Sequence, residues 1–176
     1  VPEPDNPWAQ IGYWGDHQVI YFEKLLEFCL KTKKQEFLDG LNEAIYASSN
    51  VPYRIADYEA ILKDPRNTIT FDYKLNSELL EKTKSYGTDG KLIADKDGNP
   101  YLVSITAKML QIVIGKIANL VPGGGIWLNT QRPEWNDANN ALAGYGLSVV
   151  TTCYLQRFLK ELILIYESAN QNTFTM

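Results

Sequence analysis

The feature that most constrains the fold is a long segment, residues 137–167, that is apolar on nearly every side between Ala141 and Leu159. A surface helix keeps a polar face, so a helix without one must be buried on most of its sides. Such a helix needs several neighbouring elements around it. The segment therefore predicts an α-helix inside a helical domain, in which Gly144 and Gly146 mark close packing against another backbone or a local break near a pocket.

Apolar residues elsewhere in the chain recur at intervals of three and four, which is the period of one helical face. The first such helix begins at Gly15-Asp16, where a carboxylate meets the positive end of the helix dipole. A second helix follows after a short polar turn, so the two should form an antiparallel hairpin. We expect helices over residues 15–34, 35–46, 57–62, 77–86 and 106–120, in addition to the long segment above.

Two short β-prone runs, residues 91–95 and 101–105, flank an Asp-Gly turn at 97–98, which predicts a small β-hairpin. The same loop partly matches a calcium-binding loop. It lacks the required spacing and the closing Glu, so we interpret it as a plain turn. The glycine run at 122–125 is not followed by Gly-Lys-Ser/Thr, so it is no phosphate loop and instead lets the backbone turn tightly.

Composition limits the class of protein. The chain has 176 residues, of which 45% are hydrophobic and 22% charged, with a net charge of −4. This suffices for one domain with a substantial core. Scattered Lys and Arg residues in an acidic chain argue against nucleic acid or an anionic membrane as partner, and no apolar run reaches the roughly 20 residues that span a bilayer. The chain starts without an initiator Met or a leader, so we expect a piece of a longer protein.

Cys29 and Cys153 both fall within apolar helical patterns and lie far apart in the sequence. Their separation gives neither a metal-binding spacing nor a disulfide framework. We therefore expect buried, free thiols, which favours a reducing compartment and a cytoplasmic location. His17 is the only histidine, which excludes a multi-histidine metal site on this chain, and we expect no metal and no cofactor.

Chemically active side chains concentrate in residues 130–140, which contain two carboxylates, a guanidinium, an indole and four side-chain amides. Carboxylates can exchange protons with a glycosidic oxygen, amides and Arg can bind hydroxyls, and an indole can stack on a sugar ring. Asn and Asp are also favoured at helix starts, so an elaborate helix cap is the alternative interpretation. Residue density alone does not decide between them.

A second segment has the same design. Trp14 precedes Asp16 and His17 at the start of the first predicted helix, as Trp135 precedes Asp137 at the start of the last one. The helix dipole lowers the pKa of such an Asp and burial raises it, and the sequence leaves both outcomes open. His17 fits a hydrogen-bonding residue better than a general base, so we assign it to ligand binding.

The tripeptide Trp135-Asn136-Asp137, at the start of an apolar helix after an extended loop, resembles the Trp-Asn-Asp motif of the cellobiose and chitobiose phosphorylases. Those enzymes have an (α/α)6 toroid built from six helical hairpins. Their motif Asp is the general acid that protonates the glycosidic oxygen, and their motif Trp lines the sugar site. The resemblance therefore implies Asp137 as general acid and Trp135 as a sugar-binding residue.

The wider string at 129–142, together with residues 12–18, is similar to a group of large uncharacterised bacterial proteins that we place among the six-hairpin glycosidase-like enzymes. This similarity covers most of the chain. The phosphorylase motif has an Asp immediately before its Trp, where this chain has Glu134, and the phosphate-binding residues have no counterpart here. Hydrolysis and phosphorolysis of a glycosidic bond therefore both stay open.

These features lead to one expectation for the whole chain, residues 1–176: a mainly α single domain that is a fragment of a larger (α/α)6 catalytic domain acting on an oligosaccharide or glycoside. A toroid has twelve helices of about 12 residues or more, so the chain supplies about two or three hairpins. The isolated fragment should be inactive and should associate with itself or with the rest of the parent chain. The alternative is a non-catalytic helical interaction or regulatory domain. The expected catalytic residues are Asp137, Glu134 and Asp16, and the expected sugar-binding residues are Trp135, Trp14, Arg132, Asn136, His17 and Gln131.

Overall fold

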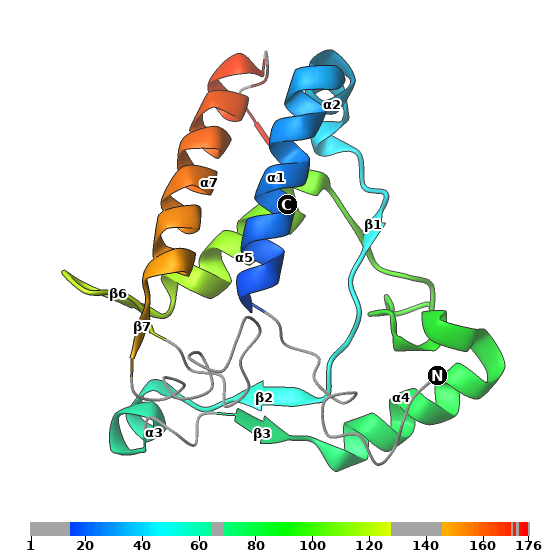
Figure 1. The fold of residues 1–176 in the computed structure, drawn as a ribbon. Helices are drawn as coiled ribbons and strands as arrows, with labels where there is room; N and C mark the ends of the chain where they lie inside the picture. The colour runs from blue at the N-terminus through cyan, green and yellow to red at the C-terminus, as the bar shows by residue number, and fades with distance from the viewer. Residues whose placement is uncertain (1–14, 65–68, 128–145, 170, 172, 176) are drawn as a thin grey trace.

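The computed structural model describes residues 15–64, 69–127, 146–169, 171 and 173–175. Helices account for most of these residues, and short antiparallel strands connect them (Figure 1), which confirms the prediction of a mainly helical fold. With 3-10 helices labelled η, the elements are α1 (Gly15–Thr32), α2 (Lys34–Asp39), η2 (Gly40–Asn42), β1 (Tyr46–Ala47), β2 (Tyr53–Ile55), α3 (Tyr58–Lys63), β3 (Ile69–Phe71), α4 (Tyr73–Tyr86), η3 (Gly87–Lys91), β4 (Leu102–Val103), α5 (Ile105–Ile117), β5 (Leu120–Val121), β6 (Gly125–Trp127), β7 (Leu147–Ser148) and α7 (Val149–Ser168).

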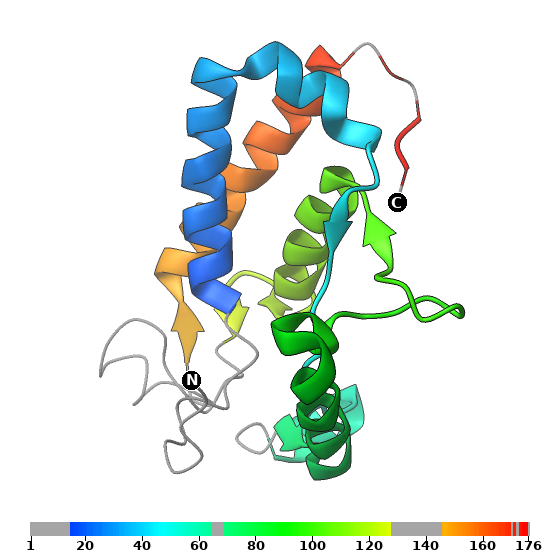
Figure 2. The same ribbon diagram turned by 90° about the vertical axis from the view of Figure 1, so that its right-hand side faces the viewer.

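The core lies between α1, α5 and α7. In each helix the buried side chains recur at three and four residues, as the sequence period requires. Helices α1 and α7 lie side by side and run in the same direction, whereas α5 crosses them in the opposite sense (Figures 1 and 2). The buried apolar cluster comprises Val19, Leu26, Leu38, Leu41, Ile105, Met109, Val113, Ile126, Leu155, Phe158, Leu162 and Ile165.

Helix α7 begins at Val149, so the continuous helix predicted for residues 137–167 is wrong at 146–148. There the backbone forms β7, in which Leu147 pairs with Trp127 of β6 and Ser148 pairs with Ile126. The Ser148 hydroxyl then accepts a hydrogen bond from the Thr151 amide at 3.1 Å and caps the helix. A strand pairing from a distant part of the chain thus overrides the local apolar pattern.

The second helix is shorter than predicted. Helix α2 and the 3-10 turn η2 end at Asn42, whereas the prediction extended to Tyr46. Tyr46 instead belongs to β1 and pairs with Val103 of β4. Helices α2 and η2 turn across the end of α1 and do not run back along its length (Figure 2). The long helix that packs along α1 is therefore α7.

The tight turn predicted around residues 97–98 is present, but its flanking runs do not form the two paired strands of the predicted β-hairpin and are joined by an isolated bridge between Ala94 and Pro100. The amide of Asp95 donates to the Asn99 carbonyl, and that of Tyr101 donates to the Ile93 carbonyl, both at 2.8 Å. Asp95 Oδ1 accepts from the amides of Asp97 and Asn99, each at 2.9 Å, so the carboxylate is occupied by its own turn. These contacts are those of a tight turn in which an Asp side chain bonds the backbone two residues on.

The strand predicted up to residue 105 ends earlier. The Ser104 hydroxyl accepts a hydrogen bond from the Ala107 amide at 3.1 Å, so Ser104 is a helix N-cap and Ile105 is the first residue of α5. The two preceding residues form β4, whose partner is β1 and not the 91–95 run. The side-chain cap decides the boundary here.

The glycine run makes the tight turn that the sequence predicts, between β5 and β6. Gly123 and Gly125 have φ values of +74° and +144°, a region that residues with a Cβ rarely adopt. A Cβ on Gly125 would lie 2.8 Å from Thr152 Oγ1, the atom that accepts the Ile126 amide at 3.0 Å. The turn therefore sets β6 directly against the first turns of α7.

Both cysteines are free, as predicted, but the expected burial is wrong for Cys153, which is exposed on α7. Cys29 is only partly buried on α1. The helical period predicts that both residues lie in helices. The period does not specify how wide the buried face of each helix is, and Cys153 lies outside the buried face of α7.

Candidate functional site

The predicted site is only partly within the described residues. Asp16 and His17 lie in the first turn of α1, where the structure gives the backbone, and the helix start predicted at Gly15-Asp16 is confirmed. The other predicted site residues lie outside the described residues: Trp14, Gln131, Arg132, Glu134, Trp135, Asn136 and Asp137.

The described structure does give the two attachment points of the segment that contains the Trp-Asn-Asp motif. This segment follows Trp127 in β6 and precedes Leu147 in β7, and these two residues are direct partners in an antiparallel pair. The segment therefore leaves the sheet and returns to it at one place. The first turn of α1 lies at the same end of the helices as β6 and β7 in both views (Figures 1 and 2).

The parallel direction of α1 and α7 has an electrostatic consequence. Each helix carries a partial positive charge at its N-terminus, and parallel helices bring these charges to the same end. The first turn of α1, the first turn of α7 and strands β6 and β7 therefore lie toward the same end of the fold. An anionic or hydroxyl-rich ligand would meet favourable dipoles there.

Trp127 lies at the base of this connection. Its backbone amide donates to the Asn119 carbonyl at 2.8 Å, which fixes the strand against the end of α5. The indole nitrogen is buried and has no hydrogen-bond partner among the described residues. Because Trp127 as a whole is only partly buried, its interpretation as a hydrophobic anchor under the glycine turn stays a prediction.

Two turns into α1, three charged side chains meet between α1 and α7. Glu23 has a fully buried side chain, and its Oε1 lies 2.7 Å from Arg157 Nε. The same Nε donates to Glu27 Oε1 at 2.8 Å, and Arg157 Nη2 also donates to that oxygen. Half of the Arg157 side chain is exposed, so the guanidinium bridges solvent and the buried carboxyl. We call Glu23, Glu27 and Arg157 the bridging cluster.

The two carboxyls of the bridging cluster titrate in opposite directions. Burial, reinforced by the negative charge of Glu27, raises the pKa of Glu23 above its ordinary value. The hydrogen bond from Arg157 holds the pKa of Glu27 below its ordinary value. Of the two carboxyls, Glu23 therefore keeps its proton up to a higher pH than Glu27 does.

The bridging cluster determines how α1 sits against α7. Because Arg157 contacts Glu23 and Glu27, which are one helical turn apart, a sliding of α1 along α7 would break at least one contact. Asp16 lies seven residues before Glu23, which is about 10 Å along the helix. The fully buried Glu23 cannot touch a ligand, and through its pairing with Arg157 it positions the first turn of α1.

The sequence carries a signal for this cluster, namely a charged residue on the apolar face of a helix. Glu23 follows Val19 by four residues and precedes Leu26 by three, so it lies on the apolar face of α1. Arg157 is exposed on α7, where it directly precedes the buried Phe158. A charged residue on a buried helical face needs a partner of opposite charge, and Arg157 supplies it to Glu23.

A groove of about 330 Å³ lies farther along the same two helices. Its walls carry both basic and acidic side chains. The groove is lined by the later turns of both α1 and α7, in agreement with the parallel direction of the two helices. It lies toward the opposite end of α1 from Asp16, so it is separate from the predicted site. The lining residues are Glu27, Leu30, Lys31, Lys34, Glu161, Leu164, Ile165 and Ser168.

Among the residues that the structure describes, no three His, Cys, Asp or Glu side chains are grouped so that they could hold a metal ion. Within the same residues, no helix has the length and apolarity needed to cross a bilayer. No family model matches the sequence, and no curated protein matches it either. The resemblance to the six-hairpin enzymes therefore rests on the motif residues alone.

Proposed function

We propose that this chain forms the catalytic side of a carbohydrate-active enzyme that acts on a glycosidic bond. The supporting observation is that the first turn of α1 and the paired strands β6 and β7 lie at the same end of the fold. Asp16 belongs to the first of these, and Asp137 belongs to the segment that leaves and returns at the second. Two carboxylates near one ligand are what glycosidic bond cleavage needs.

In this proposal Asp137 is the general acid that protonates the glycosidic oxygen, and Glu134 is its neighbour. Asp16 is the second carboxylate and activates water or phosphate. In an inverting hydrolase two such carboxyls stand about 6.5–9.5 Å apart, which leaves room for the attacking water. Sugar hydroxyls and ring faces would be bound by Trp135, Trp14, Arg132, Asn136, His17 and Gln131.

The bridging cluster supports this arrangement from a distance. It fixes α1 against α7, and thereby the position of Asp16 relative to the strand that precedes α7. Catalysis depends on such positioning, because a displacement of about 1 Å can cost about 10²-fold in rate. Glu23, Glu27 and Arg157 are in this proposal positioning residues.

The decisive experiment uses Asp137→Asn in the intact parent protein. Asn keeps the size and capping capacity of Asp but has no ionisable proton, so thermal stability should change by no more than about 1 kcal/mol. Turnover of a natural glycoside should fall about 10²–10⁴-fold. A glycosyl fluoride has a leaving group that needs no proton, so its turnover should fall far less.

Asp16→Asn serves as the matched variant, because it should impair both substrates if Asp16 activates water or phosphate. Full activity of Asp137→Asn with an unchanged melting temperature would reduce Asp137 to a helix cap and remove the main support for the enzyme proposal. The cytoplasmic location stays part of the proposal and is tested by fractionation of the parent organism's cells.

A non-catalytic interaction domain is the second candidate, and exposed apolar side chains favour it. Leu25 and Phe28 of α1 are 55% and 63% exposed, and Ile163 and Leu164 of α7 are each 56% exposed. Exposed apolar surface of this kind marks association with another segment or another copy. The isolated 176-residue chain should therefore be inactive and should self-associate in sedimentation. Robust turnover of an aryl glycoside by this chain alone would show that it is a complete catalytic domain.

A further inference from the structure

A short segment after α7 folds back onto the opposite end of the helical core. Asn42 of η2 contacts it with both atoms of its side-chain amide. Asn42 Nδ2 donates to Gln171 Oε1 and to the Thr173 carbonyl, the latter at 3.3 Å. Asn42 Oδ1 accepts from the Thr175 amide at 2.7 Å. In an extended chain the carbonyl of residue i and the amide of residue i+2 point to the same side, as those of Thr173 and Thr175 do here. Asn42 therefore binds this backbone as a neighbouring strand would.

Ser104 adds a contact from a different element. Its hydroxyl, which caps α5, donates to the Thr175 carbonyl at 2.5 Å. Ser104 is fully buried, so the hydroxyl is available to this segment and to the helix cap alone. The Thr175 peptide groups are thus held on both sides, by Asn42 through the amide and by Ser104 through the carbonyl.

The one large apolar side chain of the segment is partly buried against the core. Phe174 packs against the buried cluster, and its ring lies 4.7 Å from that of Tyr166 between centroids. An aromatic pair at this separation contributes beyond the area that it buries. The backbone contacts are indifferent to sequence, so the ring contact with Tyr166 supplies the selectivity for an aromatic residue.

We propose that Asn42, Ser104 and Tyr166 form a recognition site for an extended peptide, and that residues 171–175 of this chain are its ligand. The ligand is an uncharged, extended peptide segment with an aromatic residue in its middle. The peptide groups of the residues on either side of that aromatic residue, here Thr173 and Thr175, are the ones that the site binds. The site lies near the start of α5, far from the first turns of α1 and α7 (Figure 2), so it is independent of the proposed sugar chemistry.

Hydrogen exchange on the full chain tests the intramolecular contact. The Thr175 amide should be protected in the wild type, and Asn42→Ala or Phe174→Ala should each accelerate its exchange about tenfold or more, since each removes at least one contact. Asn76→Ala, on α4 and without a contact to the segment, is the matched control and should leave the rate unchanged. Exchange of Thr175 at the free-peptide rate in the wild type would overturn the proposal.

Binding in trans tests whether the site recognises a peptide as such. A fluorescent peptide with the sequence of residues 169–176 is titrated into the full-length Phe174→Ala chain, whose own segment is weakened. Saturable binding is expected, and it should weaken about tenfold or more in Asn42→Ala/Phe174→Ala. The wild type should bind less peptide, because its own segment competes at an effective concentration on the order of millimolar.

A peptide with Ala in place of Phe leaves the protein untouched and controls for misfolding of the double variant. Equal binding of both peptides would show that the contact with Tyr166 does not recognise the aromatic residue. Equal binding to the single and double variants would show that Asn42 does not recognise the segment. Circular dichroism melts of each variant establish that the helical core is intact during the titrations.

Discussion

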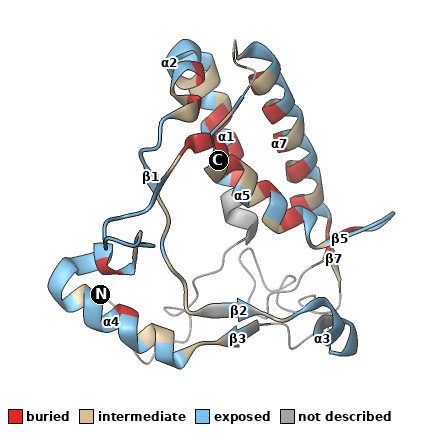
Figure 3. Ribbon diagram, turned by 180° about the vertical axis from the view of Figure 1, so that it is seen from behind, coloured by how far each residue is buried: buried red, intermediate tan, exposed pale blue. Residues whose placement is uncertain are grey.

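Two regions of this molecule have similar helical sequence patterns but differ in how far their apolar side chains are buried. The helix core consists of α1, α5 and α7 with α2, η2 and β6, and it contains the whole buried apolar cluster. The outer arm, residues 51–91, consists of β2, α3, β3, α4 and η3, and it projects away from that core (Figures 1 and 3). In α4 the fully buried residue is Leu79, and Leu80 is exposed. A helical period thus predicts a helix in both regions, but burial follows only where a partner packs against it.

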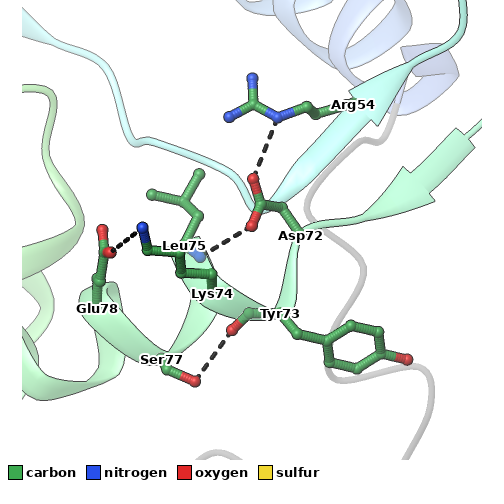
Figure 4. Close-up of polar contacts among 7 residues, drawn as sticks. All are labelled: Arg54, Asp72, Tyr73, Lys74, Leu75, Ser77 and Glu78. Atoms are coloured by element: carbon green, nitrogen blue, oxygen red, sulfur yellow. Dashed lines mark hydrogen bonds and ion pairs between the residues drawn. The ribbon is translucent and has the colours of Figure 1, made fainter.

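Polar contacts hold the outer arm together (Figure 4). Asp72 Oδ1 accepts from the Leu75 amide at 2.9 Å and caps α4, and its Oδ2 accepts from Arg54 Nε of β2 at 3.1 Å. The Leu75 amide, followed by the Arg54 side chain, holds the pKa of Asp72 below its ordinary value. Lys74 and Glu78 add an exposed ion pair at 4.0 Å. Exposed pairs contribute little, so we expect the outer arm to open before the helix core.

The largest expected effect comes from deleting a buried leucine in each region. Leu162 of α7 and Leu79 of α4 are equally buried, at 3% and 4% exposure. Leu162→Ala should destabilise the whole domain by about 2–5 kcal/mol, because many core neighbours surround the cavity. Leu79→Ala should cost less and should accelerate hydrogen exchange in the outer arm alone. Equal losses of global stability in the two variants would show that core and arm unfold as one unit.

The next largest effect is expected at Gly90, where η3 approaches the backbone of α4. A Cβ there would lie 2.6 Å from the carbonyl carbon of Lys82. Gly90→Ala should therefore destabilise the outer arm by about 1–3 kcal/mol through overpacking. Gly40→Ala is the matched control in the helix core, since its Cβ would meet nothing closer than the Glu43 carboxylate at 3.9 Å. Chemical denaturation with far-ultraviolet dichroism measures both, and an unperturbed Gly90→Ala would contradict the close approach.

A smaller, pH-dependent effect is expected in the helix core. Glu23 has a raised pKa in the folded state, so its contribution to stability is present at low pH and is lost as pH rises from its ordinary pKa of 4.5 through the folded value. Glu23→Gln removes this loss and should become more stable than the wild type as pH rises, by about 1 kcal/mol.

Glu27→Gln is the matched control with the opposite sign. The pKa of Glu27 is lowered in the folded state, so its contribution is present at neutral pH and is lost as pH falls through the folded value. This variant should be less stable than the wild type at pH 7, and the difference should shrink toward low pH. Melting curves from pH 3 to 8 measure both variants, and parallel profiles would contradict the assignment of the buried proton to Glu23.

The smallest effect is expected at the cap of the outer arm. Asp72→Asn keeps an oxygen that accepts from the Leu75 amide but weakens the pairing with Arg54. It should lower protection of the first turn of α4 only slightly, whereas Asp72→Ala removes both contacts and should fray that turn. Hydrogen exchange of the residues 73–77 compares them. Equal fraying in the two variants would assign the effect to the ion pair and not to the cap.

Several boundaries were predictable from local sequence, because a nearby side chain sets them. The start of α1 and the helix from Tyr58, capped by Asp57, agree with the prediction to within a residue. The predicted start of this helix at Ser77 is four residues late, because Asp72 is the N-cap and α4 begins at Tyr73. The signal was present in the Asp72 side chain, which is a favoured cap residue type.

The candidate site shows a different limit. The sequence identified two helix openings of similar design, around Asp16 and Asp137, but the relative direction of two helices far apart in the chain is not a local property. In the structure α1 and α7 are parallel, so the starts of these two helices, at Gly15 and Val149, face the same end of the fold, and Asp137 itself lies outside the described residues. The bridging cluster was missed for the same reason, since Glu23 and Arg157 become partners only when the helices pack.

The sequence by itself determined that this chain is helical, where most of its helices lie and where its backbone must turn, because period, caps and glycines act within a few residues. Only the tertiary structure decided that α7 starts at Val149, that α1 and α7 run parallel, and that Phe174 returns to the core. Each of these depends on a partner tens of residues or more away: β6 for the start of α7, Arg157 for Glu23, and Asn42 for the segment at 171–175. Hydrogen bonds and burial between distant residues exist only after the chain has folded, so no local pattern encodes them.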